Sequence, residues 1–169
     1  MRIVVTDACI FIDILELEIS SNFFLLNMEI HTTYEVWDEV NEEGQEILKT
    51  YRVAEKLTIH ILEPNEHQEI AKMNYPKALS PPDQSVLYMA EKLDAILLSN
   101  DGLVRKHAKK RELNTHGLFW VMDELVEQEH LSKPDASIKI KQLFENNLMY
   151  KNNSKLWKEA EKRIVEWGS

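Results

Sequence analysis

The amino-acid sequence predicts an α/β fold: a three-layer α/β/α arrangement around a central parallel sheet of about four or five strands, followed by C-terminal helices. Two observations lead to this prediction. Short apolar runs alternate with longer segments of helical periodicity, and the runs at 3–6 and 95–98 both lead into an acidic residue. Strands that alternate with helices form parallel sheets. Because the carboxyl ends of such strands meet at one edge, where ligands bind, the acids are expected at a common site.

The composition is that of a globular domain large enough to bury its own core. The chain has 169 residues, of which 44% are hydrophobic and 29% are charged. No apolar run approaches the roughly 18 residues of a membrane helix, and Asp7 comes too early for a signal peptide. Cys9 is the single cysteine, so an internal disulfide is excluded. We therefore expect a cytoplasmic protein with no membrane partner.

The net charge of −9 is unevenly distributed. Residues 1–66 hold 14 acids and 4 bases, whereas residues 67–169 hold 15 acids and 16 bases. An acidic chain is not an obvious nucleic-acid binder, because attraction to phosphates dominates that affinity. Three explanations would account for the uneven charge. The acids could keep the protein soluble, several of them could form a metal site whose bound ion neutralises them, or the second half could carry a basic contact face. The charge alone does not decide between them.

Apolar periodicity predicts the elements in order along the chain. Strands are expected at 2–6, 28–32, 57–62, 95–98 and, as a short edge strand, 113–116. A first helix is expected at 9–17, with a break near Ser20 before it resumes to 26, and a second helix is expected after a cap at Thr32 or Thr33. Further helices are expected at 45–55, 65–73, 83–93, 103–111, 118–129, 136–148 and 153–167. The prolines at 76, 81 and 82 predict a loop, and Lys133-Pro134 predicts a break. We expect a domain at 1–131 and a helical extension at 132–169 that packs on it.

Four carboxylates are candidates for a divalent-metal site. Asp7 and Asp101 follow apolar strands, while Glu39 and Asp83 lie in helical stretches that could face the same crevice. Mg²⁺ and Mn²⁺ prefer oxygen ligands and keep several waters, so two to four converging carboxylates suffice. Such an ion lowers the pKa of a bound water and offsets charge on a phosphate.

Each of these acids also has a purely structural interpretation. Asp7 and Asp101 could be helix N-caps, and Asp83 could be an acid favoured in the first turn of a helix. Glu39 could belong to a solvated helix face, and Glu35 or Asp38 could take its place as the second acid. These alternatives stay open from the sequence.

Polar and basic residues beside the acids are candidates for substrate binding. The hydroxyls of Thr6, Ser99 and Thr33 could orient metal-bound waters or a phosphate, and equally could serve as caps or turn formers. Asn100 could orient Asp101 or a water, or could form a turn. The helix beyond Asp101 carries the basic cluster 105–111, in which Arg105 and Lys106 suit an anionic phosphodiester. A solvated helix face explains the cluster as well.

Other kinds of site find little support. The six histidines lack the spacing of a zinc site, and the sequence contains no phosphate-cradling glycine loop and no G-x-S-x-G elbow. Cys9 is interpreted as a small core residue rather than a nucleophile, because no histidine is close to it in sequence.

Four acid-bearing segments in order, and a closing segment after them, resemble PIN-domain proteins across residues 1–131. Val4 to Asp13 resembles the opening strand, acid and helix of that family, and Ile30 to Val40 resembles its strand, hydroxyl cap and acidic helix. The other matching segments are 79–93, 95–105 with its basic helix, and the closing 116–118 with the apolar helix that follows. The chain departs from the family pattern at Ala8, where Thr or Ser is common, and in its length beyond 131.

The resemblance implies a Mg²⁺- or Mn²⁺-dependent ribonuclease, often the toxin of a toxin–antitoxin pair. Carried over by position, its acids are Asp7, Glu39, Asp83 and Asp101, with Asp7, Asp83 and Asp101 on the metal and Glu39 near the attacking water. The implied partners are RNA, a small antitoxin protein and a second copy of the chain.

Two other functions remain open from the sequence. The chain could be a non-catalytic PIN-like module that binds a protein partner or nucleic acid, because its C-terminal segment is rich in apolar residues. A phosphatase of another α/β family would need a second acid two residues after Asp7, where Cys9 stands.

Overall fold

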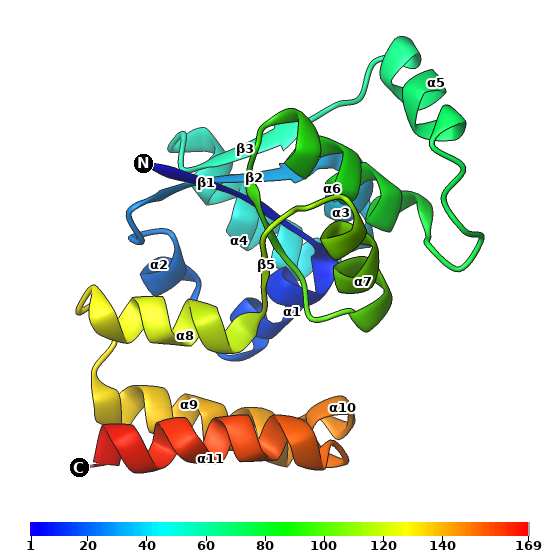
Figure 1. Ribbon diagram of the computed structural model, residues 1–169. Coiled ribbons are helices and arrows are strands. Elements are labelled where there is room, and N and C mark those ends of the chain that lie inside the picture. The colour runs from blue at the N-terminus through cyan, green and yellow to red at the C-terminus, as the bar shows by residue number, and fades with distance from the viewer. Residues whose placement is uncertain (169) are drawn as a thin grey trace. The chain divides into compact units, whose positions relative to one another are not determined.

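The structure is a computed structural model that describes residues 1–168, and its strands form one five-stranded parallel sheet (Figure 1). The strand order is β3-β2-β1-β4-β5, and every neighbouring pair is parallel. The strands are β1 (Arg2–Thr6), β2 (Met28–Thr33), β3 (Leu57–His60), β4 (Ile96–Leu98) and β5 (Thr115–His116). This confirms the predicted α/β fold with a parallel sheet of four or five strands.

The central strand β1 is covered on both faces. Val4, Val5 and Thr6 are all completely buried, and consecutive residues of a strand point to opposite faces. Such continuous burial is characteristic of parallel sheets. Thr6 pairs with Leu98 of β4, and the backbone N–H of Asp7 donates to the Leu98 carbonyl over 3.1 Å. The chain therefore leaves both strands at the same edge of the sheet.

The chain divides into two compact units. The first, the sheet unit, comprises Met1–Ile12 and Asn27–Leu118. Its long helix α6 packs against β1, β2 and β4, while α4 packs against β3 and α7 against β5. The helices of this unit are the start of α1 (Ala8–Glu16), then α3 (Tyr34–Glu39), α4 (Glu42–Val53), α5 (Pro64–Lys72), α6 (Pro81–Lys92) and α7 (Gly102–Lys110).

The second unit, the helical unit, comprises Asp13–Leu26 and the residues from Phe119 onward. Its helices are the end of α1, then α2 (Ser20–Phe23), α8 (Leu118–Glu127), α9 (Lys133–Asn146), α10 (Leu148–Lys151) and α11 (Ser154–Gly168). Helices α9 and α11 lie side by side (Figure 1). The ring of Phe144 lies 5.6 Å from that of Tyr150 and 5.0 Å from that of Trp157, centroid to centroid. Phe144 and Tyr150 are buried in the core of the unit, and Trp157 packs on Phe144 from a partly exposed position.

Helices α6 and α9 begin earlier than the sequence predicted, because their first turns contain proline. Helix α6 begins at Pro81 rather than at Asp83, and α9 begins at Lys133 rather than at residue 136. The first-turn N–H groups of a helix have no intrahelical partner, so proline is tolerated there. The predicted break at Lys133-Pro134 was therefore wrong. The short helix α10, and the end of α2 at Phe23 rather than at residue 26, were also missed.

The division into units does not follow the predicted domain boundary at residue 131. Residues 13–26 and 119–131 group with the C-terminal helices. The packing of segment 132–169 on the preceding domain stays a prediction, and Ser169 lies outside the described residues. Within residues 1–168, no helix is long and apolar enough to span a membrane.

Candidate metal centre

Asp7 lies at the end of β1 with its side chain buried. Its Oδ1 accepts a hydrogen bond from the backbone N–H of Ile10 over 3.1 Å, so it caps the first turn of α1. The Cys9 thiol lies 2.9 Å from Oδ1 and 3.1 Å from Oδ2, and the Ser99 hydroxyl also hydrogen-bonds this carboxylate. The capping interpretation is thus correct for Asp7. The three donors Ile10, Cys9 and Ser99 leave about one of the roughly four acceptor positions of the carboxylate for another ligand.

The environment of Asp7 disfavours its negative charge. Burial raises the pKa of this carboxyl from 3.8 to about 6, against the opposing effect of the hydrogen bonds from Cys9, Ser99 and Ile10. The nearby charge of Asp83 raises the pKa further. A buried carboxylate with a like charge beside it is a group that a bound cation would stabilise.

Asp101 is linked to Asp7 through the hydroxyl of Ser99. The backbone N–H of Asp101 donates to Ser99 Oγ over 3.1 Å, and the same hydroxyl hydrogen-bonds the Asp7 carboxylate. Oδ1 of Asp101 caps α7 by accepting from the N–H groups of Leu103 and Val104 at 2.9 and 3.1 Å. The two acids therefore flank one buried serine. That they share a metal ion stays a prediction.

Asp83 lies in the first turn of α6, where it forms a capping box with Ser80. Its Oδ2 accepts from the Ser80 backbone N–H over 3.2 Å, and Ser80 Oγ accepts from the Asp83 N–H over 3.3 Å. The charge of Asp83 raises the pKa of both Asp7 and Glu39. Asp83 is thus the acid that joins the other two electrostatically, from a position fixed by helix capping.

Glu39 is the last residue of α3 and is exposed. Partial burial raises its pKa, and the charge of Asp83 raises it further. Of the two competing acids in the same helix, Glu35 lies 3.9 Å from Nε2 of His67, and Asp38 is exposed, as Glu39 is. The effect of the Asp83 charge on Glu39 is the observation that favours Glu39 as the second acid, and the assignment stays a prediction.

A buried pair of hydroxyls holds α3 and α6 together beside the acids. Thr33 Oγ1 accepts from the Val36 N–H, which caps α3, and lies 2.7 Å from Ser85 Oγ. Ser85 in turn donates to the carbonyl of Pro82 over 2.7 Å. Because Ser85 uses its only proton on Pro82, Thr33 is the donor to Ser85. Thr33 thus acts as the cap that the sequence predicted, and it fixes the helices that carry Glu39 and Asp83.

The structure argues against direct substrate contact for two of the predicted residues. The side chains of Thr6 and Ser99 are completely buried. Asn100 is half-buried, and its Oδ1 accepts from the backbone N–H of Leu118 over 3.0 Å. Arg105 and Lys106 are exposed on α7, where they are accessible to a substrate.

Cys9 is the site residue that sequence reasoning missed. It was interpreted as a core residue, but it is only half-buried and its thiol contacts both carboxylate oxygens of Asp7. Its position two residues after Asp7, at the start of α1, was the available signal.

A family model described as a PIN domain matches residues 3–164. The chain belongs to the PIN-domain family. The match extends through the C-terminal helices almost to the end of α11, so the segment beyond 131 lies within the family pattern. PIN domains are typically nucleases and usually use divalent metals.

Two solved structures are similar to this chain, at low sequence identity. One is a PilT N-terminus domain protein from the hyperthermophilic archaeon Sulfolobus solfataricus P2, with 12% identity and a TM-score of 0.44 over 75% of this chain and 95% of that chain. Another is a domain of a functionally unknown protein from Methanocaldococcus jannaschii DSM 2661, with 18% identity and a TM-score of 0.44 over 70% of this chain and 91% of that chain. No curated protein matches.

The acids of this PIN domain fit a divalent metal by their chemistry. Asp7, Asp83, Glu39 and Asp101 offer the oxygen donors that Mg²⁺ and Mn²⁺ prefer. Burial, and to a lesser degree the charge of Asp83, raises the pKa of Asp7 and Glu39, and a bound cation would oppose both effects. Within residues 1–168, however, no three His, Cys, Asp or Glu side chains are gathered closely enough to form a complete metal site. The centre would therefore bind an ion with few direct protein ligands, which these ions accept because they retain water.

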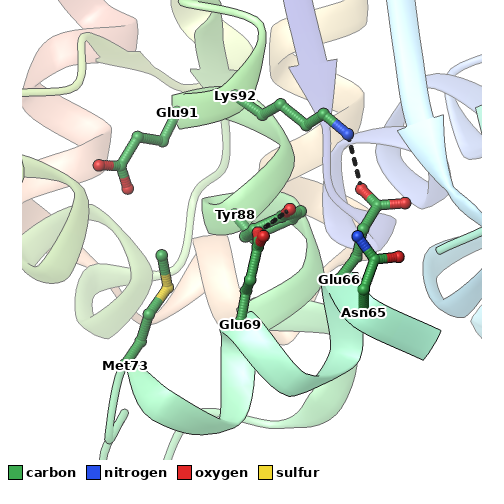
Figure 2. Close-up of a pocket in the computed structure, with 7 residues that line it drawn as sticks. All are labelled: Asn65, Glu66, Glu69, Met73, Tyr88, Glu91 and Lys92. Atoms are coloured by element: carbon green, nitrogen blue, oxygen red, sulfur yellow. Dashed lines mark hydrogen bonds and ion pairs between the residues drawn. The ribbon is translucent and has the colours of Figure 1, made fainter. Parts of the chain in front are cut away.

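The PIN domain also has a pocket of about 320 Å³ between α5 and α6, whose lining includes several charged side chains (Figure 2). Its carboxylates are paired: Glu66 with Lys92 at 2.9 Å, Glu69 with the Tyr88 hydroxyl at 2.5 Å, and Glu91 with Arg111 outside the pocket at 2.6 Å. The hydrogen bond to Glu69 raises the pKa of Tyr88 well above its usual range. The lining residues are Asn65, Glu66, Glu69, Met73, Tyr88, Glu91 and Lys92. Because its charges are satisfied internally, this pocket does not compete with the acids as the catalytic site.

Proposed function

We propose that the chain is a Mg²⁺- or Mn²⁺-dependent endoribonuclease that hydrolyses RNA phosphodiester bonds. The observation that carries the proposal is the gathering of acids around Ser99: its hydroxyl links Asp7 to Asp101, and burial together with the nearby charge of Asp83 raises the pKa of both Asp7 and Glu39. Membership of a family whose domains are typically nucleases supports the same conclusion.

Each site residue has a proposed role. Asp7, Asp83 and Asp101 would hold the ion, directly or through water, and Glu39 would position the attacking water. When bound, the ion supplies Lewis acidity: it lowers the pKa of a coordinated water and offsets charge on the scissile phosphate. Ser99 orients the carboxylate of Asp7 and the backbone of Asp101 through its hydroxyl.

The exposed basic face of α7 is the proposed RNA contact. Arg105, Lys106, Lys109 and Lys110 are all exposed on this helix, which begins directly after Asp101. Besides burial, the charges of Lys110 and Lys106 lower the pKa of His107, which shows the positive potential of this face. Such a local field attracts phosphates even on a protein of net negative charge.

The direct test is RNA cleavage with and without metal. The wild-type protein should cleave mixed RNAs in Mg²⁺ or Mn²⁺ and lose that activity in a chelator, whereas Asp7→Asn and Asp101→Asn should be inactive. Asp38→Asn is a matched control, because Asp38 is an exposed acid of α3 beside Glu39. Cleavage that persists equally in the Asp7 and Asp101 variants would contradict the assignment.

A toxin role, with a small antitoxin protein as partner, is a further part of the proposal, as are homodimer formation and a cytoplasmic location. These follow from the family resemblance and from the sequence. A small reading frame next to this gene, whose product binds the chain and suppresses cleavage, is the expected finding for a toxin.

A second candidate function is a non-catalytic module that binds a protein. The observation that favours it is that, in the described part of the chain, no three potential ligands form a complete metal site. The helical unit also exposes the large apolar side chains of Leu148, Met149 and Trp157. Calorimetric titration with Mn²⁺ separates the two candidates: absence of heat, together with stable binding to a neighbour-encoded protein, would favour the module.

A further inference from the structure

The side chain of Asn100 spans from the turn after β4 to the start of α8. Its Oδ1 accepts a hydrogen bond from the backbone N–H of Leu118 over 3.0 Å. The first N–H groups of a helix have no intrahelical partner, so this contact caps α8 from a residue 18 positions earlier in the chain. The turn that carries Asp101 is thereby tied to a distant part of the sheet unit.

Gly117 makes this contact possible. A Cβ atom at position 117 would lie 2.4 Å from Asn100 Oδ1, far inside van der Waals contact, and 3.6 Å from Asn100 Cγ. The Nη1 atom of Arg105 would lie 3.4 Å from the same point. The amide of Asn100 therefore occupies the space that any side chain at 117 would need, with the Arg105 guanidinium beside it.

The turn between β4 and α7 is thus held from two sides. On one side, Ser99 Oγ accepts from the Asp101 N–H and bonds the Asp7 carboxylate. On the other side, Asn100 binds the N–H of Leu118. Ser99 and Asn100 therefore fix the backbone next to Asp101. Their partners, Asp7 and Leu118, lie near opposite ends of the sequence of the sheet unit.

We propose that Asn100 is a positioning residue of the metal centre, and that Gly117 is required because only glycine leaves room for the Asn100 side chain. The inference rests on the proposed metal-dependent function and extends it to two residues that touch neither ion nor substrate. It also replaces the substrate-binding role that the sequence predicted for Asn100.

Metal affinity tests the positioning role. Residues that orient metal ligands typically change affinity by about 10- to 100-fold when mutated. We expect Asn100→Ala and Gly117→Ala each to weaken Mn²⁺ binding by about 10-fold or more in calorimetric titration. Gly102→Ala is the matched control: it adds the same methyl group next to Asp101, but in a place with no atom within 4 Å. Equal affinity of wild type and the Gly117 variant would overturn the proposal.

A double variant tests the steric link between the two residues. If the methyl group at 117 acts by displacing Asn100, it has nothing left to displace once Asn100 is shortened. We therefore expect Asn100→Ala/Gly117→Ala to bind Mn²⁺ as Asn100→Ala does, because effects at coupled positions are not additive. Full addition of the two single losses would show that Gly117 acts through something other than Asn100.

RNA affinity in a chelator separates positioning from substrate contact. With no metal and no cleavage, Lys106→Ala should weaken RNA binding, because Lys106 is exposed on the basic face of α7. Asn100→Ala should bind RNA as the wild type does. A loss as large as that of the Lys106 variant would return Asn100 to the substrate surface and overturn its positioning role.

Amide hydrogen exchange in the metal-free protein distinguishes failure of this inference from failure of the proposed function. Asn100→Ala and Gly117→Ala should speed exchange at Leu118 and Asp101, while Asn100→Asp, which keeps an oxygen acceptor, should restore protection at Leu118. Unchanged exchange in the alanine variants would overturn the Asn100 contact itself. If the alanine variants alter exchange but the wild-type protein binds no Mn²⁺, the Asn100 contact exists and the metal-dependent function is refuted. The positioning role is then refuted with it.

Discussion

The phenolic hydroxyl of Tyr150 donates a 2.6 Å hydrogen bond to Oδ2 of Asp13, across 137 residues of sequence. Both side chains are buried, Asp13 to 3% exposure and Tyr150 to 1%. Asp13 belongs to α1 and Tyr150 to α10, so the bond joins the two chain segments of the helical unit. A buried carboxylate needs such donors, because its desolvation is otherwise costly.

Tyr150→Phe should therefore destabilise the protein without disturbing packing. The ring stays, and Asp13 loses one donor in a buried place. Removing one partner of a hydrogen bond to a charged group costs about 1.5–3 kcal/mol, and we expect a loss of that size in the free energy of unfolding, measured by urea denaturation. Tyr34→Phe, at a residue that is 50% exposed, is the control. Equal stability of both variants would show that Asp13 does not depend on Tyr150.

Asp7→Asn should stabilise the protein at neutral and higher pH. Because the pKa of Asp7 is raised to about 6 in the folded protein, its ionised form is disfavoured by folding. Below about pH 4 the carboxyl is neutral in both the folded and the unfolded protein, so it does not lower the free energy of unfolding. As the pH rises through about 6 the buried carboxyl must ionise, and the free energy of unfolding falls. Asparagine carries no charge, so the gain should be about 1–3 kcal/mol near pH 8 and should vanish near pH 4.

The measurement is urea denaturation at several pH values. Asp38→Asn, at an exposed acid, is the control and should show no such pH dependence. A gain for Asp7→Asn that is the same at acidic and basic pH would mean that the charge of Asp7 is not the cause.

Mn²⁺ binding should weaken as the pH falls, because an acid ligand must lose its proton to bind. With the pKa of Asp7 at about 6, nearly all of this carboxyl is ionised at about pH 7.5 and about a tenth at about pH 5. We expect apparent affinity to fall about 10-fold over that range, measured by calorimetry. Asp7→Asn should remove this step along with most of the affinity. A flat pH profile in the wild type would exclude Asp7 as a ligand.

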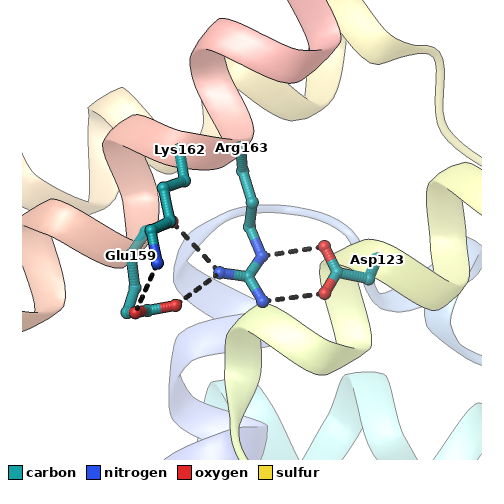
Figure 3. A network of polar contacts seen from close by, with 4 residues as sticks. All are labelled: Asp123, Glu159, Lys162 and Arg163. Atoms are coloured by element: carbon teal, nitrogen blue, oxygen red, sulfur yellow. Dashed lines mark hydrogen bonds and ion pairs between the residues drawn. The ribbon is translucent and has the colours of Figure 1, made fainter.

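The guanidinium of Arg163 ties α11 to α8 within the helical unit (Figure 3). Its Nε and Nη2 each donate to one oxygen of Asp123 over 2.8 Å, and it lies 5.2 Å from the centre of the Phe119 ring. The hydrogen bonds to Asp123 raise the pKa of Arg163. Lysine keeps the charge but cannot form this paired contact.

Arg163→Lys should therefore lower the free energy of unfolding by about 1 kcal/mol, a modest loss because Asp123 is partly exposed to water. Thermal denaturation provides the measurement. Lys162→Arg is the control, since the Lys162 side chain is 75% exposed and its ion pair with Glu159 lies on the surface. If lysine at 163 proves as stable as arginine, the paired geometry contributes nothing.

The sheet and the strand-end acids could be predicted from local pattern. An apolar run followed by an acid is a signal within a few residues, and it located Asp7 and Asp101 correctly at the ends of β1 and β4. The acids also proved to be helix caps, so the structural and functional interpretations were compatible rather than exclusive. The prolines at 81 and 134 misled the prediction, because a proline in the first turn of a helix looks like a break in a linear pattern.

Contacts between distant residues could not be predicted in this way. For Asn100 the sequence left open whether it orients Asp101 or a water, or forms a turn, because nothing near it in sequence indicates that its oxygen binds the Leu118 N–H. The same holds for Tyr150, whose acceptor Asp13 is far away in the chain. Which polar side chains reach the surface is also a property of packing, and for this reason Thr6 and Ser99 were assigned a substrate role that their burial opposes.

The hydrogen bonds to Asp7 set the pH at which it ionises, and their removal should move that pH upward. The bond from Cys9 lowers the pKa of Asp7 most, and the bond from Ser99 lowers it less. Cys9→Ala and Ser99→Ala should therefore both raise this pKa above about 6, with the larger change for Cys9, because a carboxylate that loses a donor is less stable than its neutral form. The measurement is a ¹³C NMR titration of the Asp7 carboxyl in the metal-free protein. Ser137→Ala, a buried serine of α9, is the control and should leave the midpoint in place. A lowered midpoint in either variant, or a larger effect for Ser99 than for Cys9, would contradict the contacts described for this carboxylate.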